Sequence, residues 1–380
     1  MKLLSVSGPL HKEFGGPPMA VTGICTSLAK LGHQISVLVC GQSVQDYQSN
    51  SVFFNKLISS GVQTKVIHRK NVNKYGALLR LHEIKSIWNM ISEADVIVLH
   101  QIYELQFIGI YPILILLKKP YVVMPHGTLT TYQRKQHKIR KALFYPLTYL
   151  LLRSSNGIFV ATEFEKRQLP SFLENKGSIV GLGIETQNPK IRNSINYSQN
   201  FNLLFMGRIT KKKRLDIALQ AFALASKKSE LKMKFIVCGS GEETEVAQIK
   251  QLVRDLQIEN DVEFCGWVDS YEKERTFLQS DCFILTSEDE NFAIAAAEAL
   301  AYGVPCILSS NVALASLVRK YGAGVVFAEL LPNIVATSIT NLAGQDKVVV
   351  MNSALSAASE LSWQSIALKW EESIVRILRN

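Results

Sequence analysis

The chain has 380 residues, too many for one comfortable hydrophobic core, and the usual roughly 150 residues per domain predicts two or three domains. Hydrophobic residues make up 47% and charged residues 19%, which excludes a disordered or fibrous chain. The 42 lysines and arginines outnumber the 32 aspartates and glutamates, and the net charge of +10 favours a phosphorylated ligand, an anionic membrane surface or nucleic acid.

Short apolar runs alternate with helical stretches in the first half of the chain. Such runs are typical of strands that are buried on both faces of a parallel sheet. They lie at residues 3–8, 34–40, 95–100, 120–127 and 157–162. The apolar stretch 107–117 is far short of the roughly 20 residues that span a bilayer, so we expect a helix buried against a sheet. Residues 1–18 hold too short an apolar run for a signal peptide, which predicts a cytoplasmic protein.

The second half repeats this alternation. Its apolar runs lie at residues 202–208, 234–241, 262–267, 282–287 and 305–310. Two such series, with amphipathic segments such as 215–229 between the runs, predict an α/β protein with two doubly wound parallel sheets. The polar stretch 181–200 is the expected linker. In residues 361–380, apolar side chains recur at near-helical spacing, which predicts an amphipathic helix that covers another surface.

The six cysteines lie in apolar surroundings and form no C-x-x-C pair, which is typical of small core residues in a reducing compartment. We therefore expect all six to be buried: Cys25, Cys40, Cys238, Cys265, Cys282 and Cys306.

Two motifs of the first half follow expected strands. Gly15 and Gly16 precede an expected helix at 21–31, where glycine backbone N–H groups and the helix N-terminus can approach an anion. The pattern is not G-x-G-x-x-G, and a plain loop is an equally good interpretation. His126 follows the strand at 120–124, and a histidine at a strand end is as readily a substrate contact as a structural residue.

A basic segment, residues 133–141, comes shortly after His126. It is either a solvated helix face or a docking face for an anionic membrane or a phosphorylated acceptor. Its lysines and arginines are Arg134, Lys135, Lys138, Arg140 and Lys141.

A second group of cations follows the first strand of the second half. Arg208 comes directly after the strand, and Lys213 lies in the turn before the next helix. Arginine binds phosphate bidentately and lysine supplies a compact charge, so the two can hold a pyrophosphate. The alternative is a surface patch of positive charge.

The strongest signal lies in residues 286–300. Glu298 is a carboxylate in an alanine-rich helix, where a charge is unfavourable unless a polar group meets it. Glu290 is expected at the entrance of the same helix, roughly 12 Å from Glu298 along the axis, a span that suits a ligand with hydroxyls at both ends. Alternatively, Glu290 is an N-terminal cap and Glu298 forms a structural salt bridge.

Together these motifs resemble the retaining GT-B glycosyltransferases of family 4, many of which build bacterial surface polysaccharides. The resemblance covers nearly the whole chain. In that family's E-x7-E motif, Glu290 matches the carboxylate that contacts the donor sugar, and Glu298 matches the one that contacts the ribose. Arg208 and Lys213 match the arginine and lysine that bind the donor's pyrophosphate.

The resemblance also implies an architecture and further site residues. It implies two Rossmann-like domains that face a central cleft: residues 1–185 bind the acceptor, residues 200–360 bind the nucleotide sugar, and the helix in 361–380 crosses back to the N-terminal domain. His126 and Glu290 are the implied catalytic residues. Other implied site residues are Gly15, Gly16, Asn291, Phe292 and Ala293 at the donor, and Glu163 and Gly239 nearby.

This sequence departs from the family pattern at two places. The family usually has glycine where this chain has Ala293, whose methyl group narrows the space near the donor sugar. Residues 181–185, GLGIE, replace the frequent P-N-G-[IV]-D. The change at Ala293 bears on which donor is used more than on whether the chain is active.

The resemblance implies that the acceptor hydroxyl attacks on the face from which the nucleoside diphosphate leaves. Arg208 and Lys213 would carry the leaving charge, so we expect no cofactor and no metal beside a UDP- or GDP-sugar substrate. The acidic run at 288–290 could imitate a metal motif, but a capping and sugar-binding turn is the favoured interpretation. We expect a lipid-linked saccharide acceptor and a peripheral location at the inner face of the cell membrane. The alternatives are a GT-B epimerase of nucleotide sugars and a non-catalytic scaffold or nucleic-acid-binding protein, and nothing in the sequence resembles a nucleic-acid recognition motif.

Overall fold

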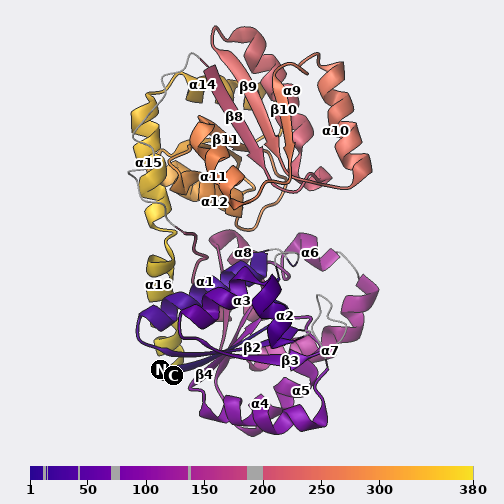
Figure 1. The fold of residues 1–380 in the computed structure, drawn as a ribbon, viewed down its shortest axis with the longest axis vertical. Coiled ribbons are helices and arrows are strands. Elements are labelled where there is room, and N and C mark those ends of the chain that lie inside the picture. The colour runs from indigo at the N-terminus through magenta and orange to yellow at the C-terminus, as the bar shows by residue number, and fades with distance from the viewer. Residues whose placement is uncertain are drawn as a thin grey trace. The chain divides into compact units, whose positions relative to one another are not determined.

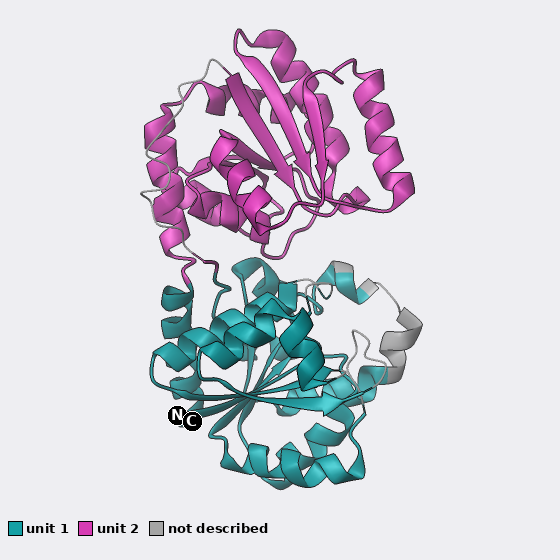
Figure 2. Ribbon diagram, viewed as in Figure 1, with its two compact units in different colours: residues 1–183, 363–380 teal, residues 184–362 magenta. Residues whose placement is uncertain are grey.

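The computed structural model describes residues 1–11, 14, 16–41, 43–69, 78–135, 138–185 and 200–379, without the side chains of 132, 135 and 138–143. The chain forms two compact units (Figure 2). Unit 1 comprises residues 1–183 together with 363–380, and unit 2 comprises residues 184–362. Most of the expected linker, residues 186–199, lies outside the described residues.

Unit 1 contains a seven-stranded parallel sheet in the order β3-β2-β1-β4-β5-β6-β7 (Figure 1). Its strands are β1 Lys2–Ser7, β2 Gln34–Gly41, β3 Gln63–His68, β4 Val96–His100, β5 Tyr121–Met124, β6 Gly157–Val160 and β7 Gly177–Ile179. Its helices are α1 Gly16–Lys30, α2 Val44–Asn50, α3 Val52–Ser59, α4 Leu81–Glu93, α5 Phe107–Leu116, α6 Thr131–Lys135, α7 Lys138–Ser154, α8 Glu163–Arg167, the 3-10 helix η2 Ser171–Lys176 and α16 Trp363–Arg379.

Unit 2 contains a six-stranded parallel sheet in the order β10-β9-β8-β11-β12-β13. Its strands are β8 Asn200–Met206, β9 Lys232–Cys238, β10 Val262–Gly266, β11 Cys282–Leu285, β12 Cys306–Ser309 and β13 Gly324–Phe327. Its helices are the 3-10 helix η4 Lys211–Lys213, α9 Leu215–Lys228, α10 Glu243–Asp255, α11 Ser270–Gln279, α12 Ile294–Ala301, α13 Ala315–Tyr321, α14 Pro332–Ala343 and α15 Lys347–Ser359.

Both sheets follow the same winding rule. In each one the first three strands run outward in one direction and the next strand returns to the other side of the first, so the order reverses between β1 and β4 and between β8 and β11. Loops at such a reversal diverge and leave room for a ligand at the carboxyl ends of the strands. The doubly wound α/β class expected from the sequence is confirmed for both units.

All ten expected apolar runs form strands, and three further strands were not expected. The three are β3, β7 and β13, and each lies at the edge of its sheet. In β3 and β7, polar residues interrupt the apolar ones, as is typical of strands that are covered less completely, whereas β13 is a short apolar run that was overlooked.

Two expectations about burial need correction. The stretch 107–117 forms α5 as expected, but Ile108, Ile115 and Leu116 are exposed, so only one face of this helix is buried. Five cysteines are buried, whereas Cys265 is exposed. Cys265 lies in the edge strand β10, where the register shifts between Phe264 and Gly266.

The helix α16 completes the core of unit 1. Trp370 is 2% exposed and its ring meets Phe159 of β6 edge-on, with 5.0 Å between centroids. Trp363 lies over Gly23 of α1, where a side chain larger than hydrogen would overlap the indole ring. Among the described helices, none combines the length and apolar character needed to cross a bilayer.

Candidate functional site

Arg208 stands at the point of unit 2 where the strand order reverses. It follows β8 directly, and its side chain is exposed. Within the described part of the chain, Arg208 makes no hydrogen bond and no ion pair. A guanidinium that is unpaired at this edge can bind an anion through two parallel hydrogen bonds.

Glycines bring the loops after β8 and β9 together beside Arg208. Gly207 donates its N–H to the Cys238 carbonyl at 2.9 Å, and Ile209 donates to Ser240 at 2.8 Å. A Cβ at Gly239 would overlap the carbonyl oxygen of Gly207, so a larger residue does not fit there. The expected site residue Gly239 therefore forms part of the same edge as Arg208.

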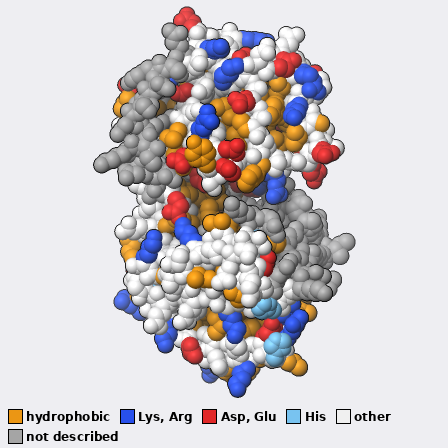
Figure 3. Space-filling model, viewed as in Figure 1, with side chains coloured by type: hydrophobic (Ala, Val, Ile, Leu, Met, Phe, Trp, Pro, Cys, Tyr) orange, Lys and Arg blue, Asp and Glu red, His pale blue; other side chains and the backbone are white. Residues whose placement is uncertain are grey.

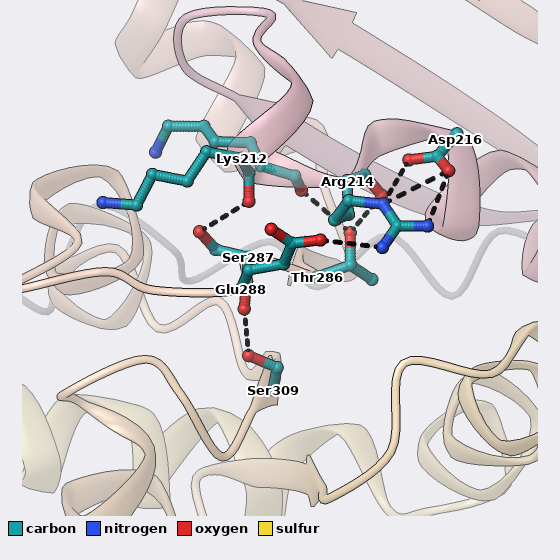
Figure 4. A network of polar contacts seen from close by, with 8 residues as sticks. Lys212, Arg214, Asp216, Thr286, Ser287, Glu288 and Ser309 are labelled. Atoms are coloured by element: carbon teal, nitrogen blue, oxygen red, sulfur yellow. Dashed lines mark hydrogen bonds and ion pairs between the residues drawn. The ribbon is translucent and has the colours of Figure 1, made fainter. Parts of the chain in front are cut away.

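Three consecutive cations face three consecutive acids at this edge. The pairs are Lys212 with Asp289 at 3.4 Å, Lys213 with Glu290 at 2.7 Å, and Arg214 with Glu288 at 2.9 Å. Figure 4 shows the guanidinium of Arg214 between Glu288 and Asp216. The cations are on η4 and the residue after it, and the acids are on the loop between β11 and α12.

Hydrogen bonds to main-chain carbonyl groups hold these two segments in register (Figure 4). Thr286 Oγ1 donates to the carbonyl of Arg214 at 2.7 Å, and the N–H of Glu288 donates to the carbonyl of Lys212 at 3.0 Å. Ser309 Oγ donates to the carbonyl of Ser287 at 2.5 Å and ties the loop to β12. The positions of the charged side chains are thus fixed by backbone contacts that do not depend on the charges.

Glu298 finds its polar partner on a different helix. Its Oε1 lies 2.6 Å from Nζ of Lys273, which projects from α11. Both side chains are partly exposed, so the pair remains open to solvent and to a ligand. The requirement for a partner was evident from the sequence, whereas the identity of Lys273 was not, because nothing in the sequence places α11 beside α12.

The expected position of Glu290 at the helix entrance is wrong. The helix α12 begins at Ile294, and Ala293 before it has a left-handed backbone with φ of 62°. Glu290 lies four residues before the helix. Its backbone N–H donates to the carbonyl of Asn311 at 3.1 Å. Glu290 is therefore neither a cap nor a helical residue, and the separation of roughly 12 Å along a helix axis does not apply.

The remaining donor-site residues of this motif lie in the same loop. Phe292 is 6% exposed and Ala293 is 5% exposed, while Asn291 is half-buried. The structure thus places Lys213 against Glu290 beside the strand ends of unit 2, with Arg208 in the loop after β8 and Glu298 on α12, the helix that follows β11.

Unit 1 has a comparable edge at the ends of β4, β5 and β6. His126 follows β5 with a left-handed φ of 51°, and its Nε2 lies 2.9 Å from Nδ1 of His100 at the end of β4. The next residue, Gly127, donates its N–H to Glu165 at 2.6 Å, and Ala161 donates to the other oxygen of Glu165 at 2.8 Å. Burial lowers the pKa of His126 to about 4, so its imidazole is neutral at physiological pH.

Glu104 is a further buried acid at this edge. It lies after β4, is 2% exposed, and its Oε2 has no hydrogen-bond partner in the described part of the chain. A Cβ at position 8, after β1, would lie 2.8 Å from its Oε1, so Gly8 makes room for the carboxyl group. Burial raises the pKa of Glu104 to about 8, which keeps it protonated at neutral pH.

The other site residues expected in the first half do not all lie where the sequence predicted. The side chain of Glu163 is exposed and pairs with Arg167 at 3.2 Å, and it is Glu165 that holds the loop of His126. Gly16 is the first residue of α1, which begins earlier than the expected position 21, and Gly15 lies outside the described residues. In the basic segment, the side chains of Lys135, Lys138, Arg140 and Lys141 lie outside the described part, while Arg134 is exposed on α6.

A metal cluster is not formed by the acidic run. In the described residues, no group of three or more histidine, cysteine, aspartate or glutamate side chains is arranged to hold a metal ion. Glu288, Asp289 and Glu290 each have a cation as partner.

Comparisons with known proteins agree with this division into two halves. The family model described as glycosyl transferases group 1 matches residues 187–346, and the model described as Glycosyltransferase Family 4 matches residues 14–188. An uncharacterized glycosyltransferase of Methanocaldococcus jannaschii is 21% identical over 372 residues, 93% of this chain and 92% of that protein. The amylovoran biosynthesis glycosyltransferase AmsK of Erwinia amylovora is 26% identical over 157 residues, 39% of this chain and 37% of its own.

Solved structures show the same likeness. The crystal structure of HepE from Anabaena in complex with UDP and glucose superposes with a TM-score of 0.72 at 17% identity and covers 99% of both chains. At this identity, the superposition shows that the two chains share a fold.

Proposed function

Because this chain belongs to the group 1, family 4 glycosyltransferases and has their GT-B fold, we propose that it transfers a hexose-type sugar from a nucleoside diphosphate sugar to a glycan acceptor, with retention of anomeric configuration. The glycosyltransferases that it resembles include the amylovoran biosynthesis glycosyltransferase AmsK, which supports a role in surface polysaccharide synthesis. A structural neighbour binds UDP and glucose, which supports a nucleotide sugar as the donor.

The observation that carries this proposal is the charge arrangement at the carboxyl edge of unit 2. The two acids of the E-x7-E motif are each held by a lysine, Glu290 by Lys213 and Glu298 by Lys273, while Arg208 has no partner among the described residues. A donor brings two hydroxyl-bearing rings for the acids and a pyrophosphate for the cations. The ion pairs hold both carboxylates in place until the donor binds.

In the proposed reaction, Arg208 and Lys213 stabilise the charge that develops on the departing diphosphate. Lys213 exchanges its contact with Glu290 for a phosphate oxygen, and Glu290 is thereby free to accept a hydrogen bond from the donor sugar. The bond between the anomeric carbon and the phosphate oxygen breaks as the acceptor oxygen bonds to the same face of the sugar, and the proton of the acceptor hydroxyl passes to the departing diphosphate oxygen. With two cations at the leaving group, we propose that no metal is needed.

The first experiment is a thermal-shift panel of UDP-, GDP- and ADP-glucose, each with and without Mg²⁺. A ligand at 100 times its Kd stabilises the native state by about 2.7 kcal/mol, so one nucleotide class is expected to raise the Tm clearly. Glu298→Gln, which keeps the size of the side chain, is expected to remove the shift, and the exposed Glu329→Gln in the same unit should leave it intact. Equal shifts in both variants would contradict the assignment of Glu298.

The stereochemical proposal is tested on the product. Proton NMR of freshly formed product is expected to show the anomeric configuration of the donor, with the same rate in EDTA as in Mg²⁺. An inverted anomer, or loss of turnover in EDTA, would exclude the retaining or the metal-free part of the proposal respectively.

We further propose a lipid-linked acceptor at an anionic membrane surface, on the basis of the basic segment 133–141. Each cation close to an anionic surface contributes about 1 kcal/mol, so changing Lys138, Arg140 and Lys141 to Gln should weaken vesicle binding about 100-fold at low salt. Changing Lys227, Lys228 and Lys232 of unit 2 to Gln removes the same charge and serves as the control. Sedimentation with phosphatidylglycerol vesicles measures both variants, and equal binding by both would contradict this acceptor surface.

A further inference from the structure

His100 and His126 form a hydrogen-bonded pair whose protons can be placed. The two nitrogens are 2.9 Å apart, and the ring planes differ by 20° with centroids 5.2 Å apart. Nearly coplanar rings at this separation suit an N–H···N bond in the ring plane. One nitrogen carries the hydrogen and the other accepts it, because both imidazoles are neutral: burial lowers the pKa of both rings.

The surroundings of His100 decide which nitrogen is the donor. His100 is 1% exposed, and its other nitrogen, Nε2, is buried with no hydrogen-bond partner in the described part of the chain. Its ring packs against Trp370 of α16, 6.4 Å between centroids and 21° from parallel. A neutral imidazole carries one hydrogen, so a hydrogen placed on Nε2 would be a buried donor with nothing to bind. Buried donors without an acceptor are rarer in proteins than unfilled acceptors, so the hydrogen of His100 belongs on Nδ1.

It follows that Nε2 of His126 is the acceptor and that the hydrogen of His126 is on its own Nδ1. This Nδ1 makes no hydrogen bond to a described residue and is not among the fully buried polar atoms that lack a partner, and the His126 residue is partly exposed. The loop that carries it is fixed by Glu165 through the N–H of Gly127. His126 therefore presents an N–H to whatever binds at this edge, while its lone pair is already occupied.

We propose that His100 is a positioning residue that holds His126 in the neutral Nδ1–H tautomer, so that His126 meets the sugar substrate as a hydrogen-bond donor to an oxygen atom and not as a base. The part concerning the sugar rests on the proposed transferase function. The tautomer itself belongs to the free protein. Trp370 supports this arrangement, because its ring packs against His100 and keeps the imidazole in the plane of the hydrogen bond to His126.

The test is NMR of the free, full-length protein labelled with 15N at its seven histidines. The ring signals of His126 and His100 are assigned by their loss in His126→Gln and His100→Gln. The expected result is a protonated Nδ1 and an unprotonated, hydrogen-bonded Nε2 for His126, unchanged between pH 5.5 and 8. A protonated Nε2 on His126, or titration of His126 within that range, would overturn the proposal.

Two substitutions of His100 separate positioning from packing. His100→Phe keeps a ring against Trp370 but has no donor, and His126 is expected to move towards the Nε2–H tautomer. His100→Gln retains an N–H donor and is expected to keep more of the native tautomer, even if its Tm falls further than that of His100→Phe. A His126 tautomer that is the same in wild type and His100→Phe would refute the role of His100.

Enzyme kinetics then test whether His126 donates a hydrogen bond to the sugar substrate. Loss of one such hydrogen bond should lower kcat/KM about ten-fold in His100→Phe, with recovery in His100→Gln. The NMR results stand whether or not sugar transfer is found, so failure of the proposed function and failure of this inference are distinguishable.

Discussion

The left-handed backbone of Ala293 places a methyl group where glycine would have none. Its φ of 62° is a conformation that costs an L-residue roughly 1–2 kcal/mol. The main chain needs this turn because Glu290 pairs with the residues after β12, while α12 sets out in a new direction from Ile294.

Ala293→Gly is therefore expected to stabilise unit 2 by about 0.5–1 kcal/mol, since relief of the strain exceeds the entropy that glycine adds to the unfolded chain. Urea unfolding followed by fluorescence measures the change. Ala295→Gly, at the second residue of α12, is the matched control and should destabilise by about 1 kcal/mol. A loss of stability in both variants would mean that the left-handed turn carries no strain.

Glu104 makes the stability of unit 1 depend on pH. The pKa of its carboxyl is raised by burial from 4.5 to about 8. Between these values, the folded protein holds a proton that the unfolded chain has released, so the free energy of unfolding falls by about 1.4 kcal/mol for each unit of rising pH. Below pH 4.5 both states are protonated and the effect vanishes.

Glu104→Gln is neutral at every pH and should remove this slope. The Tm of the variant, relative to wild type, is expected to rise steadily from pH 5 to pH 8. Buried histidines titrate in both proteins, and their contribution cancels in the difference. Glu163→Gln, an exposed position of the same unit, controls for the loss of a charge, and parallel Tm curves for wild type and Glu104→Gln would show that Glu104 is ionised in the fold.

Residue types at strand ends could be predicted from the sequence, while their partners could not. The carboxyl end of each strand was evident from the apolar runs, so Arg208, His126 and the region of Glu290 were found. Lys273 and His100 were missed because their importance arises from contacts across the sheet. The start of α12 was misplaced because alanine is an ordinary helix former and gives no sign of a left-handed residue.

At the scale of elements, the close approach of α1 and α16 depends on one glycine. Trp363 occupies the space that a Cβ of Gly23 would need, and the neighbouring Gly183 also lies under the same indole. The two helices are far apart in the sequence, and this packing joins them in the core of unit 1.

Gly23→Ala is expected to destabilise unit 1 by about 2 kcal/mol, because a methyl group in a filled space forces the helices apart. This opposes the usual gain of about 1 kcal/mol when alanine replaces glycine in a helix. Gly109→Ala in α5 is the control: a Cβ there would meet only the side chain of Leu79, 2.8 Å away, which can turn aside. Thermal unfolding compares the two, and a more stable Gly23→Ala would contradict the packing.

Sheet edges explain which strands could be predicted. Central strands such as β4 are buried at every residue and form an apolar run, whereas β3 and β7 carry exposed positions. Edge strand β10 was nevertheless found, because Val262 and Phe264 supply the alternation that a half-covered strand shows.

For the whole molecule, the surplus of positive charge is not gathered in one place on the face that Figure 3 shows, where basic and acidic side chains are interspersed. At the site of unit 2, lysines 212, 213 and 273 are paired with acids. The net charge of +10 is therefore a poor guide to the ligand, and the unpaired Arg208 is more informative.

Unit 2 is continuous in sequence and has its own sheet and core, so residues 184–362 are expected to fold when produced alone. Residues 1–183 lack α16, so this fragment should expose the apolar side chains that Trp370 covers in the complete unit. This exposure predicts aggregation or a loss of cooperative unfolding. Circular dichroism and urea unfolding of the two fragments measure this. Adding a peptide of residues 363–380 to the 1–183 fragment is expected to restore a cooperative transition, and a fragment that unfolds cooperatively without the peptide would show that α16 is dispensable.

Because unit 1 is formed from two separate stretches of the chain, it can complete its fold only late in translation. The ribosome adds 179 residues between Gly183 and Trp363, which takes roughly 10–40 s at the usual 5–20 residues per second. During that interval unit 2 can finish folding. In unit 1, Phe159 and His100 lack the contact with Trp370 of α16 that covers them in the complete protein. Unit 1 is thus synthesised first but can finish folding only after α16 has been made. During this interval a chaperone that binds exposed apolar surface would bind the incomplete unit 1.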